Sequence, residues 1–198
     1  SNVGASTSAT LPAPTGTAGT FDYNLVSVAY QSGADCSNPI IGKATVLVNP
    51  TPDATASVPS QTICSGDPIT TIALSGSVAG TTYNWVRTPV AGITGMSTSG
   101  TGNAISGNLT NTTSAPITVT FTITPTANTC GGTAITATVL VNPTPNAVAT
   151  PASQTKCSGV AITAIGLSGA TAGTTFSWTR NNAATVTGIP DGTGASIT

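Results

Sequence analysis

The stretch VLVNPTPDATASVPSQTICSG at residues 46–66 returns at residues 139–159 as VLVNPTPNAVATPASQTKCSG. The match continues without a gap through LSGSVAGTTYNWVR, whose second copy is LSGATAGTTFSWTR. Trp85 and Trp178 are therefore 93 positions apart. Solenoid repeats have units of about 20–50 residues, which is too short for this period. A period near 93 is typical of a β-sandwich of about 100 residues that folds on its own.

The repeat divides the chain into three parts. We expect residues 51–143 to form one complete β-sandwich and residues 144–198 to be the N-terminal half of the next repeat. Residues 1–50 read as the C-terminal half of the preceding repeat, because Cys36 and ATVLVNP correspond to Cys130 and a second ATVLVNP. We interpret the boundaries as a window on a longer array; strand exchange between neighbouring chains is the alternative.

The hydrophobic pattern indicates strands. In ITVTFTIT, residues 117–124, apolar residues alternate with threonine, and AITATVLV at 134–141 repeats this pattern. A period of two is expected of a strand that has one face in a core. Gly, Pro and Asn clusters interrupt these runs, and no stretch shows helical periodicity over three turns. The predicted fold class is therefore all-β, with tandem immunoglobulin-like β-sandwiches arranged end to end.

Composition excludes several functions. Charged residues are 5% of the chain and the net charge is −1, whereas nucleic-acid binding needs clustered Lys and Arg. No apolar run reaches the roughly 18 residues of a membrane helix. The first ten residues, SNVGASTSAT, have no signal-peptide pattern and read as the interior of a longer protein.

No catalytic, cofactor-binding or metal-binding residue is predicted. The chain has no His and no Glu, and its five Asp residues are scattered singly. General acid–base catalysis and nucleophilic triads both need a base that this sequence does not supply. A Ca²⁺ site needs several converging carboxylates, and the aligned repeat replaces Asp53 by Asn146 and Asp67 by Val160.

Paired prolines mark each junction between repeats. The segment VNPTP places Pro50 and Pro52 at the first junction and Pro143 and Pro145 at the second. Proline fixes φ and biases the preceding residue towards extended geometry. We expect these four residues to form short, semi-rigid interdomain hinges that hold neighbouring repeats end to end.

The cysteines fit the repeat in two ways. One pairing joins Cys64 to Cys130 within the complete repeat, and we favour it because it makes the repeat self-sufficient. The other joins Cys36 to Cys64 and Cys130 to Cys157 across the junctions. The first pairing fails if the turn after the first strand and the loop before the last strand lie at opposite ends of the sandwich, beyond the reach of a disulfide.

Trp85 and Trp178 occupy the place of the central-strand tryptophan that such a sandwich buries. We expect both in the core; an exposed platform for stacking carbohydrate is the alternative. Arg87 and Arg180 follow by two residues and share the tryptophan face of a regular strand. Each is expected to pack its aliphatic stem against the sheet rather than bind a ligand.

The chain resembles the PKD-like, immunoglobulin-like repeats of large secreted surface proteins of Bacteroidota. SQTICSG, GTTYNWVRT, the stretch from GTGNAIS to NTCGGT, and the ending ATVLVNPTP carry the resemblance. The WDFGDG-type signature of the original PKD domain is absent, since VRTPVAG follows Trp85. The resemblance implies a non-enzymatic adhesin, filament or stalk on the bacterial cell surface.

The predicted function is therefore a stiff extracellular stalk or fibre without catalysis. Its partners would be neighbouring repeats of the same polypeptide, and other filament chains or surface glycans. The alternative is an accessory carbohydrate-binding or spacer module of a secreted polysaccharide-degrading protein. Glycan binding through the threonine ladder TVTFTITPT is disfavoured, because threonine is an ordinary exposed strand residue.

Overall fold

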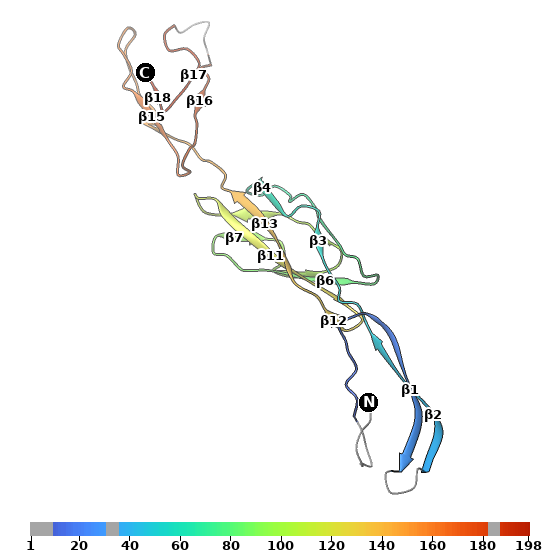
Figure 1. Ribbon diagram of the computed structural model, residues 1–198. Coiled ribbons are helices and arrows are strands. Elements are labelled where there is room, and N and C mark those ends of the chain that lie inside the picture. The colour runs from blue at the N-terminus through green and yellow to red at the C-terminus, as the bar shows by residue number, and fades with distance from the viewer. Residues whose placement is uncertain (1–9, 31–35, 182–186) are drawn as a thin grey trace.

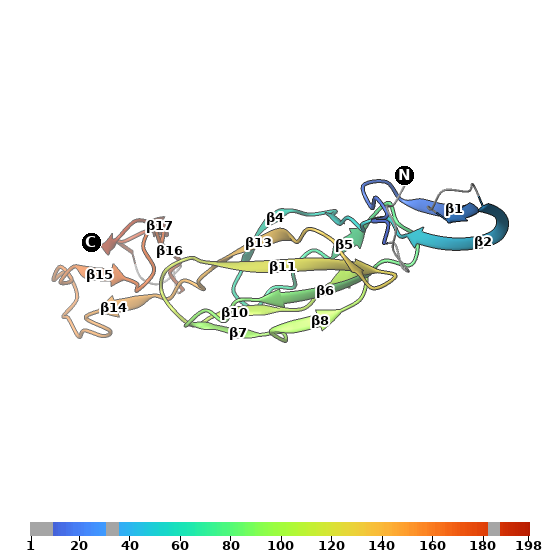
Figure 2. The ribbon, with the colours of Figure 1, turned by 60° about the horizontal axis from the view of Figure 1, so that its bottom comes forward.

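The computed structural model describes residues 10–30, 36–181 and 187–198. This part of the chain contains strands and no helix, so the predicted all-β class is confirmed. Figures 1 and 2 show the strands in three groups along an elongated chain. At one end lies an antiparallel hairpin of β1 (Gly19–Tyr30) and β2 (Cys36–Val48), and at the other end lie β14 to β18.

The strands of the middle group lie in two facing layers. One sheet has the order β4–β13–β11–β6–β8, with β12 paired to β11. Its strands are β4 (Ser60–Cys64), β6 (Thr82–Arg87), β8 (Ser99–Thr101), β11 (Ile117–Ala127), β12 (Cys130–Gly131) and β13 (Ile135–Asn142). The facing layer consists of β3–β5–β9 and β10–β7. Its strands are β3 (Thr55–Ala56), β5 (Ile72–Ser75), β7 (Ile93–Gly95), β9 (Ala104–Ile105) and β10 (Leu109–Asn111).

Alternating burial explains the long central strands. Along β11 the residues Val119, Phe121 and Ile123 are fully buried, while most of the intervening threonines reach the surface. β11 pairs antiparallel with β13 on one side and with β6 on the other. This matches the alternation of the sequence, although β11 continues three residues beyond the expected end at 124.

Pro125 lies inside β11 and does not end the strand. It pairs with Tyr83 of β6, whose carbonyl accepts a hydrogen bond from Gly102 on the opposite, β8 side. The pair therefore does not require the N–H that proline lacks. The carbonyl of Pro125 accepts a hydrogen bond of 2.9 Å from the N–H of Gly132, and its ring is fully buried.

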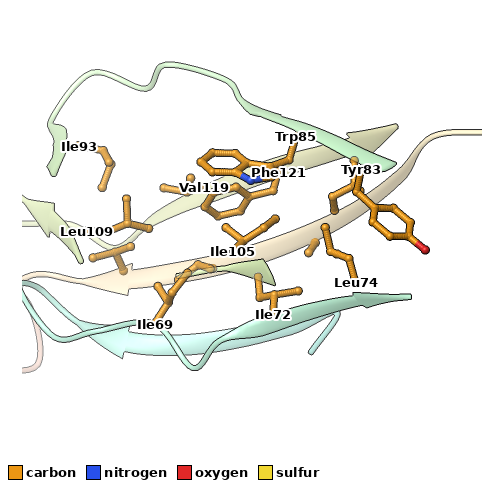
Figure 3. Close-up of a cluster of buried hydrophobic side chains, with 14 residues drawn as sticks. Ile69, Ile72, Leu74, Tyr83, Trp85, Ile93, Ile105, Leu109, Val119 and Phe121 are labelled. Atoms are coloured by element: carbon orange, nitrogen blue, oxygen red, sulfur yellow. The ribbon is translucent and has the colours of Figure 1, made fainter. Parts of the chain in front are cut away.

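One hydrophobic core fills the space between the two sheets (Figure 3). Trp85, Val119 and Phe121 project from one sheet towards Ile72 and Ile105 on the other layer. Burial of one such aliphatic or aromatic side chain contributes about 1.5–3 kcal/mol. Apart from Pro52 and Pro143, all the buried apolar side chains among the described residues lie between Ile69 and Val141. The middle group is thus the only part with a closed core in the described chain.

A two-residue turn connects β11 to β12. Ala127 and Cys130 are paired, and Asn128 and Thr129 between them have φ values of 48° and 66°. Positive φ at both central residues is the type I′ turn geometry, which suits the twist of a hairpin. Asparagine tolerates this region well, whereas a β-branched threonine does not.

The C-terminal group contains short strands in two small sheets, β14–β15–β18 and β16–β17. Its strands are β14 (Val148–Thr150), β15 (Ile165–Ser168), β16 (Ser177–Trp178), β17 (Gly192–Thr193) and β18 (Ser196–Ile197). Residues 153–157 form no strand, although the aligned residues 60–64 form β4. β4 pairs with β13, whereas residues 153–157 pair with no strand among the described residues.

Candidate functional site

Several carboxylates of the described residues accept hydrogen bonds from other parts of the chain. Two hydrogen bonds reach Oδ1 of Asp53, one of 2.6 Å from the backbone N–H of Ser77 and one of 2.7 Å from its hydroxyl. These bonds lower the pKa of Asp53. Asp22 accepts hydrogen bonds from Lys43 and Thr45 on the β1–β2 hairpin, and these bonds also lower its pKa. Across the described ranges no three His, Cys, Asp or Glu residues gather where they could hold a metal ion.

Trp85 lies inside the sandwich and offers no stacking surface. Its side chain is 8% exposed, and its ring meets Phe121 edge-on, with centroids 5.8 Å apart and planes at 68°. The indole is also covered by Gly100 of β8, where a Cβ atom would overlap the ring. Glycine at this position is therefore required by the close approach of the strand to the tryptophan.

Arg87 is buried on the same face of β6 as Trp85. Its Nη2 donates a hydrogen bond of 2.8 Å to the carbonyl of Met96, and its Nε donates to that of Ser97. Both acceptors belong to the loop before β8. The guanidinium thus ties this loop to the sheet and leaves no free cationic surface for a ligand.

Trp178 and Arg180 occupy the aligned positions in the C-terminal group but are only half-buried. Gly192 covers the indole of Trp178 as Gly100 covers that of Trp85. Nε1 of Trp178 and Nε and Nη1 of Arg180 are shielded from solvent and have no hydrogen-bond partner among the described residues. The counterpart of β11, with its Phe121, is missing from this group.

The predicted disulfide between Cys64 and Cys130 is wrong. Both residues, and Cys157, are free thiols. Cys64 pairs with Asn142 at the last residue of β13, whereas Cys130 lies before its first residue. The eight residues of β13 span about 26 Å, far beyond the roughly 6.8 Å that a disulfide allows between Cα atoms. The side chain of Cys36, part of the alternative pairing, lies outside what the structure describes.

The four junction prolines differ in burial. Pro52 and Pro143 are buried, while Pro50 and Pro145 are exposed. The backbone of Pro52 is in contact with Gly132 at the tip of the β11–β13 hairpin, where a Cβ atom would overlap its carbonyl. Pro143 directly follows β13. The two buried prolines thus adjoin the two ends of the complete sandwich.

Asn111 is a buried polar residue to which the sequence alone assigned no structural role. Its amide donates 2.7 Å and 2.9 Å hydrogen bonds to the carbonyls of Ala115 and Val141. Its Oδ1 accepts bonds from the backbone N–H and the hydroxyl of Thr113. The signal was the motif NTT, in which the asparagine binds its own backbone two residues on, as in an Asx turn.

Comparison with known protein families agrees with this geometry. Residues 61–145 match the PKD-like domain family. The matched segment, called the PKD-like domain below, begins within β4 and ends just beyond β13, and includes Trp85, Arg87 and Asn111. Domains of this family are generally non-catalytic modules of extracellular and cell-surface proteins. No curated protein matches the chain.

In the part of the chain that the structure describes, no helix has the length and apolar character that a membrane crossing requires.

Proposed function

We propose that the chain is a non-catalytic spacer, a segment of a stiff extracellular stalk or fibre on a bacterial surface, built from PKD-like sandwiches joined end to end. The observation that carries the proposal is the return of the same local contacts 92 or 93 residues further along the chain. Because the contacts repeat as well as the amino-acid sequence, they support a second unit of the same fold after the PKD-like domain.

The recurring contacts include two side-chain hydrogen bonds and the close approach of a glycine to a tryptophan. The N–H of Ser77 donates to Oδ1 of Asp53, and in the second copy the N–H of Ala170 donates to Oδ1 of Asn146. Likewise, the N–H of Thr70 donates to Oε1 of Gln61, and the N–H of Thr163 donates to Oε1 of Gln154. Their lengths are 2.6 and 2.7 Å for the first pair, and 2.7 and 2.8 Å for the second. The third contact is the glycine that covers each tryptophan.

The junctions support a rod rather than a cluster. Asn49 in the first junction donates a 3.4 Å hydrogen bond to the carbonyl of Asn128 at the hairpin tip, next to the buried Pro52. The second junction leaves from the other end of β13 through the buried Pro143. Because the chain enters at one end and leaves at the other, each added sandwich increases the length. The partners in this function are adjacent repeats of the same polypeptide.

The buried positions of Trp85 and Arg87 argue against the carbohydrate-binding alternative, which needs an accessible aromatic platform.

The stalk proposal is tested by small-angle X-ray scattering of the 198-residue chain at several low concentrations. A compact chain of this length has a radius of gyration of about 16 Å. We expect a value at least half as large again after extrapolation to zero concentration. A value near that of the compact chain would overturn the end-to-end arrangement.

A further inference from the structure

The junction that enters the PKD-like domain packs against one end of that domain. The chain leaves β2 and passes beside β12, the short strand that follows the β11–β12 turn (Figure 1). Pro52 is fully buried there, although the family match begins only at residue 61. The last residues of the junction are therefore part of the folded domain that follows them.

Two glycines admit the backbone of the junction. A Cβ atom on Gly132, just after β12, would overlap the carbonyl oxygen of Pro52. A Cβ atom on Gly76, in the loop after β5, would overlap the carbonyl oxygen of Asp53. Two hydrogen bonds from Ser77 to the carboxylate of Asp53 hold the same residue. The backbone thus approaches the domain more closely than a residue with a Cβ atom allows.

The contact at Asp53 recurs at the second junction. A Cβ atom on Gly169 would overlap the carbonyl oxygen of Asn146, and the N–H of Ala170 donates a 2.7 Å hydrogen bond to Oδ1 of Asn146. Asn146 follows Pro145 as Asp53 follows Pro52. At both junctions, the residue after the second proline is thus fixed by the unit that it enters.

The β11–β12 turn makes a further contact with the first junction. The carbonyl oxygen of Asn128 accepts a 3.4 Å hydrogen bond from Nδ2 of Asn49 and a 2.6 Å bond from the hydroxyl of Thr129. Asn128 and Thr129 both have positive φ, which is unfavourable for threonine. A strained conformation that persists in a fold is a reason to look for a role. Here the strained turn presents a carbonyl group to the chain that precedes the domain.

We infer that these contacts form a latch, which fixes the direction in which the β1–β2 hairpin leaves the PKD-like domain. The latch consists of Asn49 and Pro52 in the junction, and of Asn128 and Gly132 in the domain. Between its two contacts lie the exposed residues Pro50 and Thr51. Both ends of this pair are held by the same domain, and the ring of proline restricts φ. The first junction is therefore a fixed joint and not a swivel.

A fixed joint controls rotation as well as bending. Units joined by a flexible linker sample many mutual orientations, whereas units joined by a latched one keep a single orientation. In a stalk, the same faces of successive sandwiches would then recur at constant angles about the long axis. This consequence rests on the proposed function, while the latch itself rests only on the contacts described above.

Two neighbouring glycines provide a test variant and its matched control. Gly132→Ala places a methyl group where the carbonyl of Pro52 lies and must displace the junction. Gly131→Ala is the control, because a Cβ atom there meets no other atom within 4 Å. Neither glycine has a positive φ, so alanine does not add the strain of a left-handed backbone. Asn49→Ala is a second variant, which removes only the bond to Asn128.

The measurement is ¹⁵N relaxation of the 198-residue chain, expressed as backbone order parameters. In the unmodified chain and in Gly131→Ala, we expect values of about 0.85, typical of rigid backbone, at Asn49 and Thr51. In Gly132→Ala both values should fall below about 0.6, as in flexible backbone. Asn49→Ala should lower the value at position 49 alone.

Residual dipolar couplings extend the test to slower motion. The couplings of β2 and of the PKD-like domain should fit one common alignment in the unmodified chain and in Gly131→Ala. In Gly132→Ala the two segments should need separate alignments. The amide signals of β11 and β13 report whether each variant keeps the sandwich. If Gly132→Ala does not fold, Asn49→Ala carries the test, because Asn49 precedes the sandwich.

The inference is overturned if the order parameters of Asn49 and Thr51 are already low in the unmodified chain. It is also overturned if neither variant lowers them, or if Gly131→Ala lowers them as far as Gly132→Ala. A flexible junction together with an extended scattering profile would reject the latch and leave the stalk proposal standing. A rigid junction with a compact profile would support the latch and reject the stalk.

Discussion

At the scale of single residues, hydrogen bonds of buried or capping side chains fix loops that the apolar core does not reach. Asn111 joins the loop after β10 to the end of β13 through the carbonyls of Ala115 and Val141. Asp53 holds the loop after β5 through Ser77. Both side chains bond to backbone groups and thereby hold these loops to the sandwich.

Replacement of Asn111 by aspartate is expected to lower the free energy of unfolding by about 3 kcal/mol. The substitution keeps the shape but turns two donors into acceptors that face the carbonyls of Ala115 and Val141. Urea unfolding followed by circular dichroism measures the change. Asn108→Asp is the matched control, because Asn108 is exposed and donates a single bond to Gly66. Equal effects of the two substitutions would contradict the role assigned to Asn111.

Protonation of Asp53 is expected to weaken the fold in acid. The hydrogen bonds from Ser77 lower its pKa in the folded state, while the unfolded chain has the ordinary value. The stabilisation is therefore complete above the ordinary pKa and is lost as the pH falls through the lower, folded-state value. Asp53→Asn should keep the cap without titrating, as Asn146 does in the next repeat.

The measurement for Asp53 is the urea midpoint from about pH 6 down to about pH 2.5, which brackets carboxyl titration. The midpoint of the unmodified chain should decline more steeply than that of Asp53→Asn. Asp67→Asn is the control and should follow the unmodified chain, because the carboxylate of Asp67 accepts no hydrogen bond within the described ranges. Identical pH profiles for all three proteins would show that the Asp53 cap does not contribute to acid sensitivity.

At the scale of strands and turns, the β11–β12 turn carries a local cost. Thr129 has a φ of 66°, a region where β-branched residues are strained by about 1 kcal/mol or more. Thr129→Gly should therefore raise the free energy of unfolding by about 1 kcal/mol. Thr126→Gly, in the adjoining strand, should lower it by about 0.5–1 kcal/mol. Differential scanning calorimetry compares the two, and a lower melting temperature for Thr129→Gly would refute the strain.

The sequence predicted the long strands because their side chains alternate. Residues 117–124 and 134–141 have one apolar and one polar face, and they became the centre of the larger sheet. The continuation of β11 through Pro125 was missed, because proline is normally a sign that a strand ends. The N–H that proline lacks is not needed at this position, because the pairing with β6 does not use it. This is a property of the folded sheet.

The short strands and the cysteine positions depend on tertiary structure. β3, β7, β8, β9 and β10 have two or three residues each, too few for a periodic pattern. The parallel pairing of β4 with β13 joins segments about 78 positions apart, and the sequence alone does not give its direction. That direction carries Cys64 away from Cys130. The disulfide prediction failed for this reason.

At the scale of the whole molecule, the four junction prolines differ in burial. Pro52 is buried beside the hairpin tip of the PKD-like domain, and its sequence equivalent Pro145 is exposed. Pro143 is buried directly after β13, and its sequence equivalent Pro50 is exposed. The described chain thus buries one proline of each pair, at an end of the PKD-like domain.

The parallel pairing of β4 and β13 has a mechanical consequence for a chain under tension. Its five residue pairs, from Thr138–Ser60 to Asn142–Cys64, link the strand near the start of the domain to the strand at its end. A pull on the two ends loads these hydrogen bonds in shear, so that they must break together rather than one after another. Single-molecule pulling of the chain should record one high-force rupture for the PKD-like domain, and Ile63→Pro should abolish it by removing one bond of the clamp.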